Sequence, residues 1–246
     1  MIIHTYERTH RGRVCEECIR TSELRADEVF ILPIPSTRDG VLIRDTEIPL
    51  DNIVSCAKRG VYVICYGLPC AVKEKMLARG ALVYDAGEDE EFLVGNAELT
   101  ALCALGIILG SEKRSPRDLS LGIVGYGRIG KKLTQLLLFL GSTVRVYTSR
   151  DNTRLELCEC GVASSISTRD ANFSGIDILI NTAPAVIFDT TDKSFEKLRV
   201  VDLASGNNFP SLQTCERYPN IPAKMFPESA GALLAKSAVS YFAAHK

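Results

Sequence analysis

Tryptophan is absent from this chain of 246 residues, and aromatic residues as a whole make up only 7% of it. The formal net charge is −1, and no run of Lys and Arg dominates the sequence. Proteins that bind nucleic acid usually combine a basic surface with aromatic side chains that stack on bases. The sequence therefore argues against nucleic acid as a partner.

Long apolar runs are also lacking. The stretches "ALCALGIILG" and "LLLFLG" are shorter than the ~20 residues that cross a bilayer. The opening "MIIHTYERTHRGR" is charged within a few residues and has no apolar core of a signal peptide. We therefore expect a soluble, cytoplasmic protein with no membrane partner.

Histidine is scarce, with residues at positions 4, 10 and 245 only. The nine cysteines are an odd number for a disulfide framework, and without a signal peptide they indicate a reducing compartment. His4, His10, Cys15 and Cys18 have spacings that zinc can use. The alternative is a helical turn rich in Arg and Glu, with solvent-facing thiols. We favour that alternative and expect no metal in the functional site, but metal binding by this array stays open.

Strands and helices alternate through the first 95 residues. The expected elements are strands at 28–36, 61–67 and 81–87 and helices at 52–60 and 69–80. In the last helix, Pro69 stands near the start and Gly80 follows the end, which is typical of helix termini. Residues 1–95 are therefore expected to form a small parallel α/β domain on the substrate side.

A second alternating series follows an apolar helix expected at 96–114, with Asn96 as its N-cap. The expected strands lie at 119–127, 143–149, 177–184 and 199–206, and the expected helices lie at 130–141, 154–161 and 228–244. The sequence predicts a second domain at 96–227. The C-terminal helix, 228–246, is able to return to the first domain.

The stretch "GIVGYGRIG" has the spacing G-x-G-x-x-G directly after an apolar strand and at the start of a helix. Gly125 permits a tight turn, Gly127 lets a pyrophosphate approach the backbone, and Gly130 lets the helix pack on the strand. The helix N-terminus offers N–H groups and a positive dipole end to phosphates. This context predicts a Rossmann-like NAD(P)-binding domain. Its phosphate loop consists of Gly125, Tyr126, Gly127, Arg128, Ile129 and Gly130.

The second strand of such a domain usually ends in a carboxylate that binds the adenosine ribose. Here it ends in Thr148, Ser149 and Arg150, and the first acid is Asp151. Two hydroxyls and a guanidinium favour a 2′-phosphate, since Arg binds phosphate through two hydrogen bonds. The sequence therefore favours NADP. NAD remains the alternative if Asp151 takes the ribose.

Several motifs together resemble the A subunit of dipicolinate synthase, a family related to D-2-hydroxyacid dehydrogenases. They are "ADEVFILPIPST", "NAELT", "GIVGYGRIGKKL", "DILINTAPAVIF", "VVDLAS" and "PESAGALLA", in this order between about residues 27 and 240. The pair "INTAPA" and "DLAS" is the most specific part.

The resemblance implies an enzyme that oxidises a dihydrodipicolinate-type intermediate of the lysine pathway to dipicolinate, a product of sporulating bacteria, with a nicotinamide cofactor. It implies a small dicarboxylate substrate and, as partner, a flavoprotein-like B subunit. It also implies further cofactor contacts at Asn181, Thr182, Ala183, Pro184, Leu203, Ala204 and Ser205.

Departures from the family pattern concern the substrate. Thr100 is kept, but Leu102 stands where an acid is usual, and Glu228 stands where a lysine is usual. Residues 206–208 replace a cation followed by Pro-Gly-Gly. Two cations near the cleft are therefore missing. The remaining candidates to bind the substrate are Ser36, Thr37, Arg38, Asn96, Thr100 and Lys224.

These departures leave two other functions open. One is a related hydroxyacid-type dehydrogenase, and the other is a catalytically silent nucleotide-binding subunit or partner protein. The sequence identifies no catalytic residue. The N-terminus is expected to be shortened relative to the family, which would leave a sheet edge exposed. We therefore expect a homo-oligomer or a hetero-complex.

Overall fold

The structure is a computed structural model in which the contacts divide the chain into two compact units. The first comprises Met1–Asn96 and Pro222–Lys246, and the second comprises Ala97–Ile221. The second unit thus ends slightly earlier than the expected domain at 96–227. The structure describes residues 1–150, 152–153, 156–157, 162, 164–167, 171–185, 195, 198–204, 208–209, 212 and 214–245.

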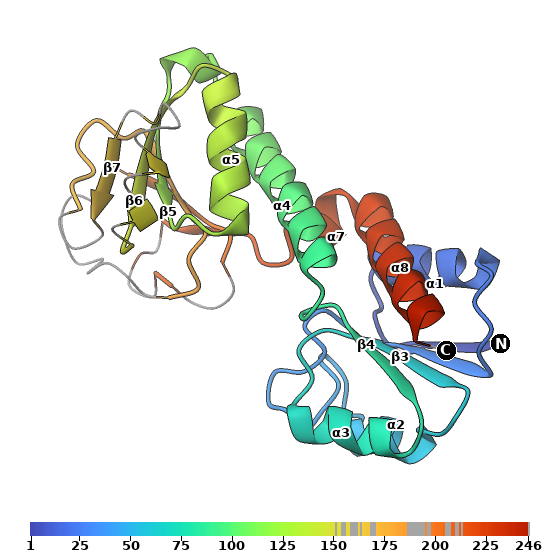
Figure 1. Ribbon diagram of the computed structural model, residues 1–246. Helices are drawn as coiled ribbons and strands as arrows, with labels where there is room; N and C mark the ends of the chain where they lie inside the picture. Colours follow the sequence, from blue (N-terminus) through green and yellow to red (C-terminus); the bar gives the residue numbers. More distant parts are fainter. Residues whose placement is uncertain are drawn as a thin grey trace. The chain divides into compact units, whose positions relative to one another are not determined.

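The first unit is a parallel sheet covered by helices on both faces (Figure 1). Its strands, in the spatial order β1-β2-β3-β4, are β1 (Ile2–Thr5), β2 (Glu28–Ile31), β3 (Val61–Cys65) and β4 (Leu82–Asp85). On one face lie α1 (His10–Thr21) and α8 (Pro227–Ala244), and on the other lie α2 (Leu50–Cys56) and α3 (Cys70–Ala78). The C-terminal helix therefore belongs to the first unit.

The first strand was not expected from the sequence, which indicated only a helical turn in the region that forms α1. β1 is short and partly exposed, and it pairs in parallel with β2, from Ile2 opposite Glu28 to Thr5 opposite Ile31. This edge of β2 is therefore covered. Any pairing with another chain at this side would use the edge of β1 instead.

A buried ion pair follows β1. Glu7 and Arg11 are 1% and 2% exposed, and the Arg11 Nη2 donates to Glu7 Oε2 over 2.7 Å. The same carboxylate accepts hydrogen bonds from the Thr9 hydroxyl, at 2.5 Å, and the Ile34 N–H, at 3.1 Å. Burial alone would raise the pKa of Glu7, but Arg11 and these hydrogen bonds outweigh burial and leave it below its usual value. The pair thus joins the loops that follow β1 and β2.

The second unit is a six-stranded parallel sheet in the order β10-β9-β8-β5-β6-β7. The strands are β5 (Ser120–Val124), β6 (Thr143–Thr148), β7 (Ser164–Ser167), β8 (Ile178–Asn181), β9 (Arg199–Asp202) and β10 (Glu216–Arg217). The strand order is that of a Rossmann fold, in which the chain changes direction along the sheet between β5 and β8. The predicted α/β class with two parallel sheets is confirmed. Strands β7 and β10 are additions to the sequence prediction.

The remaining helices are α4 (Glu90–Ser111), the 3-10 turn η1 (Pro116–Asp118), α5 (Arg128–Phe139) and α7 (Ile221–Met225). By length and composition, α4 could cross a membrane. Its side chains at Ala101, Cys103, Ala104 and Ile108 are nevertheless fully buried in the core of the second unit. That core explains the apolar composition of the helix.

The start of α4 corrects one expectation. The helix begins at Glu90, and Asp89 caps it by accepting hydrogen bonds from the N–H groups of Glu91 and Phe92, at 2.9 and 3.2 Å. Asn96 therefore lies inside the helix and is not its N-cap. The sequence prediction failed because the charged run before Asn96 resembles a turn.

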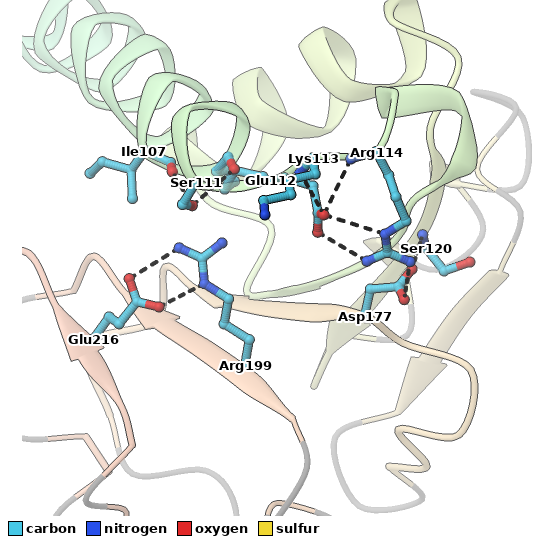
Figure 2. Close-up of polar contacts among 10 residues, drawn as sticks. Ile107, Ser111, Glu112, Lys113, Arg114, Ser120, Asp177, Arg199 and Glu216 are labelled. Carbon is cyan, nitrogen blue, oxygen red and sulfur yellow. Dashed lines mark hydrogen bonds and ion pairs between the residues drawn. The ribbon is translucent and has the colours of Figure 1, made fainter.

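Ion pairs hold the amino edge of the second sheet together (Figure 2). Arg114 pairs with Glu112 and Asp177, and Asp177 also accepts the N–H of Ser120 over 2.8 Å. The other pair joins the first residues of β9 and β10, with 2.6 Å between Arg199 Nε and Glu216 Oε1. These charges satisfy one another, so this edge has a structural role.

We expect the exchange of Glu7 for Gln to lower the free energy of unfolding by about 3–5 kcal/mol, because it leaves a buried guanidinium without its carboxylate. Because the pKa of Glu7 is lowered in the folded state, its contribution is complete above the ordinary value of 4.5 and is lost as the pH falls. Denaturant unfolding between pH 7 and pH 3 should show this difference between wild type and Glu7→Gln narrowing with acidity.

The control is Glu16→Gln, which removes a pair of the same spacing, Glu16 with Arg20, on α1, the helix that contains Arg11. Arg20 in that pair is 56% exposed and Glu16 is 29% exposed, and such pairs contribute at most about 1 kcal/mol. An equal loss of unfolding free energy in the two variants would contradict the structural role of Glu7.

Candidate functional site

A cavity of about 230 Å³ opens at the carboxyl edge of the second sheet. Three segments that the sequence analysis singled out line it together: the glycine loop, the tip of β6 and the turn after β8. The lining residues are Gly125, Tyr126, Gly127, Tyr147, Thr148, Ser149, Arg150, Thr182, Ala183 and Pro184. Ligands of parallel α/β sheets bind at this edge, where the strand order reverses.

The three glycines of the loop have different surroundings. Gly125 has a φ of +88°, which L side chains rarely adopt, and a Cβ there would also meet Thr182 Oγ1 at 3.0 Å. A Cβ on Gly130 would lie 2.3 Å from the Gly125 carbonyl oxygen, so Gly130 permits the close approach of helix and loop. A Cβ on Gly127 would meet nothing within 4 Å. The fold itself therefore requires glycine at positions 125 and 130 but not at Gly127.

The loop leads directly into α5, whose N-cap is Gly127. The predicted contacts Arg128, Ile129 and Gly130 form the first turn of that helix. N–H groups in a first turn are not used within the helix, and together with the helix dipole they attract anions. The open space beside Gly127 thus adjoins a helix N-terminus, and both features fit a pyrophosphate.

At the tip of β6 the three predicted residues differ in exposure. Thr148 is 5% exposed, and its Oγ1 accepts a hydrogen bond from the Arg150 N–H over 3.2 Å, which fixes the turn. Ser149 and Arg150 are exposed and line the cavity. In the part of the chain that the structure describes, no carboxylate pairs with the Arg150 guanidinium. Asp151, the alternative contact, lies outside the described residues.

The turn after β8 is held against the glycine loop. The Thr182 Oγ1 donates to the carbonyl oxygen of Val124 over 2.9 Å, and the Ala183 N–H donates to Asn181 Oδ1 over 3.1 Å. Asn181 itself is 1% exposed and lies beneath the turn. Of the residues predicted here, Thr182, Ala183 and Pro184 reach the cavity, and Asn181 supports them.

The predicted residues after β9 lie beside this turn. The Leu203 N–H donates to the Asn181 carbonyl oxygen over 3.0 Å, and the Ala204 N–H donates to Asp202 Oδ1 over 3.1 Å. Neither Leu203 nor Ala204 is among the residues that line the cavity. Ser205 lies outside the described residues. The contacts predicted for 203–205 therefore remain predictions.

The sequence analysis missed Tyr147 as a lining residue. Burial raises the pKa of the Tyr147 hydroxyl, which donates a hydrogen bond of 2.7 Å to the Asn172 carbonyl oxygen. Its place directly before Thr148 was the available signal. The described lining residues include no carboxylate, histidine or lysine, so this cavity is suited to binding and orienting a ligand.

Three of the predicted substrate residues follow β2 in the first unit, and two of them make hydrogen bonds within their own loop. Ser36 is fully buried, and its Oγ donates to the Pro33 carbonyl oxygen and accepts the N–H of Tyr66, at 2.9 and 2.8 Å. Thr37 Oγ1 donates to Asp39 over 3.1 Å, and it accepts the Gly40 N–H. These hydroxyls shape the loop.

The third of them, Arg38, is 74% exposed and forms an ion pair of 2.9 Å with Asp45. Asn96 and Thr100 lie within α4, where Asn96 is half-buried and Thr100 is 5% exposed. Lys224 is exposed on α7. The role of these residues in substrate binding remains a prediction.

The array His4, His10, Cys15 and Cys18 is spread over β1 and α1. His4 Nε2 lies 3.1 Å from Glu28 Oε2, and Cys15 is fully buried, where desolvation raises its pKa to about 12. Among the described residues, no group of three His, Cys, Asp or Glu side chains is arranged to hold a metal ion.

We expect Gly127→Ala to weaken dinucleotide binding by roughly tenfold or more, because its methyl group would occupy the space that a phosphate needs. The backbone at Gly127, with φ −83°, suits alanine, so the free energy of unfolding should change by less than about 1 kcal/mol. Titration with NADP tests the expected loss of affinity, and thermal unfolding tests the expected small change in stability.

Gly130→Ala is the matched contrast, because its Cβ would strike backbone. It should lower the free energy of unfolding by about 1–3 kcal/mol or more. Unchanged binding in Gly127→Ala would exclude this loop as the phosphate site.

Comparison with known proteins adds to this geometry. No protein-family model matches the sequence, and no curated protein matches it. The dipicolinate synthase A chain from Bacillus subtilis is similar in structure, with a TM-score of 0.76, 16% identity and coverage of 100% of this chain and 96% of that one.

The corresponding dipicolinate synthase protein from Bacillus halodurans has a TM-score of 0.71, with 19% identity and coverage of 92% and 83%. The D-lactate dehydrogenase of Escherichia coli has a TM-score of 0.56, with 10% identity and coverage of 96% and 94%. The chain therefore has the fold of dipicolinate synthase A subunits and of dehydrogenases, which confirms the predicted resemblance at the level of the fold.

Proposed function

We propose that this chain is an NADP-dependent oxidoreductase of the dipicolinate synthase A type, which oxidises a dihydrodipicolinate-type intermediate to dipicolinate. The observation that carries the proposal is the cavity where the glycine loop, the tip of β6 and the turn after β8 meet. The likeness to two dipicolinate synthase structures supports this choice of substrate.

Each segment of the cavity has a separate role toward the dinucleotide. The space beside Gly127 and the N-terminus of α5 would hold the pyrophosphate. Arg150 and Ser149, both exposed at the cavity, would bind a 2′-phosphate, and a guanidinium does so through two charge-assisted hydrogen bonds. The turn at 182–184 would lie toward the nicotinamide half. NAD is the alternative cofactor.

When bound, the nicotinamide ring accepts the hydride that the oxidation releases. The protein's own contribution would be to bind and orient the ligands and to exclude water, because the described lining of the cavity includes no carboxylate, histidine or lysine. Oxidation to an aromatic ring is strongly downhill, so correct placement of donor and acceptor can supply most of the rate. We therefore assign no catalytic residue.

The second candidate is a catalytically silent subunit that binds the dinucleotide. It is favoured by the hydroxyls of Ser36 and Thr37, which make hydrogen bonds within their own loop, and by the pairing of Arg38 with Asp45. A silent subunit is also favoured by the absence of a cation at 206–208 and by Glu228, which stands where the family usually has a lysine. A hydroxyacid-type dehydrogenase is the third candidate, supported by the likeness to D-lactate dehydrogenase.

A homo-oligomer or a complex with a flavoprotein-like B subunit is part of the proposal, and a cytoplasmic location in a sporulating cell would follow from the reaction. The exposed edge of β1 is the surface most suited to pairing. Light scattering of the chain alone and with a B subunit should detect a species larger than the monomer. A monomer under both conditions would contradict this part.

The turnover assay generates the intermediate from pyruvate and aspartate semialdehyde and follows reduced cofactor and dipicolinate together. We expect both to rise, and to rise faster with NADP than with NAD. Arg150→Ala should weaken NADP binding roughly 10- to 100-fold, the worth of a charge-assisted hydrogen bond, and leave NAD binding unchanged.

Arg145→Ala is the control, because Arg145 lies on β6, which ends two residues before Arg150, and donates to the carbonyl oxygens of Asn172 and Ser174, neither of which lines the cavity. It should leave the ratio of NADP to NAD affinity unchanged. NADP binding without turnover, even with a B subunit, would favour the silent subunit. Equal loss of both cofactors in Arg150→Ala would refute the 2′-phosphate site.

A further inference from the structure

Asp202 is a buried carboxylate beneath the candidate cavity, and the proposed reaction does not use it. It is the last residue of β9 and is 1% exposed. In the sheet it lies opposite Asn181, the last residue of β8, which is equally buried. In the described part of the chain no Lys, Arg or His forms an ion pair with it. Burying a charge costs free energy unless hydrogen bonds or an opposite charge compensate for the lost water.

The hydrogen bonds to Asp202 come from the end of β8 and from the segment that follows β9. Its Oδ1 accepts the Asn181 Nδ2 over 2.8 Å and the Ala204 N–H over 3.1 Å. The Nδ2 of Asn208 lies 3.4 and 3.3 Å from the two oxygens, which makes those bonds weak. The strongest partner is therefore Asn181, whose side chain reaches the turn that lines the cavity.

Asn181 holds that turn from two sides. Its Nδ2 also donates to the Ala183 carbonyl oxygen over 3.0 Å, and its Oδ1 accepts the Ala183 N–H over 3.1 Å. Both bonds require one orientation of the amide, with nitrogen toward Asp202. A carboxylate only accepts hydrogen bonds, so Asp202 excludes the flipped amide, in which two oxygens would face each other.

The orientation of Ala183 matters to the cavity. A Cβ on Gly125 would lie 3.2 Å from the Ala183 Cβ and 3.3 Å from its nitrogen, so the turn rests directly on the glycine loop. Thr182, Ala183 and Pro184 line the cavity beside that loop. If the peptide group of Ala183 were rotated, the shape of this side of the cavity and the polar groups that it presents would both change.

We propose that Asp202 is a positioning residue, which acts through the amide of Asn181 to fix the Thr182–Pro184 wall of the cavity. This inference rests on the proposed function, in that the ligand positioned by the wall is the nicotinamide half of the dinucleotide. The affinity for the dinucleotide should therefore depend on whether the side chain at position 202 can accept a hydrogen bond. This effect would come in addition to any effect on the free energy of unfolding.

Asp202→Ala tests this role, because it removes both acceptor oxygens, whereas an asparagine would keep one oxygen for the bonds that Oδ1 accepts. We expect the Kd for NADP to rise at least roughly tenfold, the effect of one lost buried hydrogen bond. Hydrogen exchange of the Ala183 amide in the free protein should accelerate by a similar factor. Asn181→Ala, which removes the intermediary, should reproduce both effects.

Asp85→Ala is the matched control. Asp85 is also a buried carboxylate at the end of a strand, and it accepts the N–H groups of Gly67, Leu68 and Gly87 in the first unit. It should lower the Tm, as Asp202→Ala should, yet leave the Kd for NADP and the exchange of Ala183 unchanged.

The outcomes separate the two proposals. If wild type binds no dinucleotide, the proposed function fails, and the exchange of Ala183 still decides the positioning role. If wild type binds NADP and a folded Asp202→Ala or Asn181→Ala binds it equally well, the positioning role is wrong. Unchanged exchange at Ala183 in both variants would overturn it as well.

Discussion

The parallel register of the second sheet is the constraint on which the candidate site depends. Tyr147, Val124, Asn181 and Asp202 stand opposite one another on β6, β5, β8 and β9. After these residues the chain leaves the sheet at the same edge, one residue later on β6 than on the other three strands, which gathers the β6 tip, the glycine loop and the turn after β8. A shift of one residue in any strand would turn its side chains to the other face and separate these segments.

The two edges of this sheet use polar groups differently. At the amino edge, Arg114 with Asp177 and Arg199 with Glu216 neutralise each other (Figure 2). At the carboxyl edge the bonds around Asp202 run among backbone and amide groups, and the exposed Arg150 remains next to the cavity. An exposed positive side chain and backbone that a ligand can approach closely thus lie at the same edge of the sheet, where an anionic ligand would bind.

The parts that the sequence predicted well are those set by local chemistry. The glycine spacing, the apolar strands and the end of α3 at Gly80, with φ +88°, follow from short-range rules. The rest depended on distant partners. The hydrogen bond between the Ser36 hydroxyl and the Tyr66 N–H could not be foreseen, because these residues lie 30 positions apart in the chain. The short, half-polar β1 has no clear strand pattern without the neighbouring β2, and the role of Asp202 needs the register with Asn181.

The most direct measurement is a crystal structure of the chain with NADP. The account predicts the pyrophosphate beside Gly127 at the N-terminus of α5, the 2′-phosphate on the Arg150 guanidinium, and the nicotinamide half along residues 182–184. A dinucleotide bound elsewhere, or one whose ribose avoids Arg150, would contradict the site. An empty cavity at saturating NADP would contradict the assignment of this chain as a dinucleotide-binding oxidoreductase.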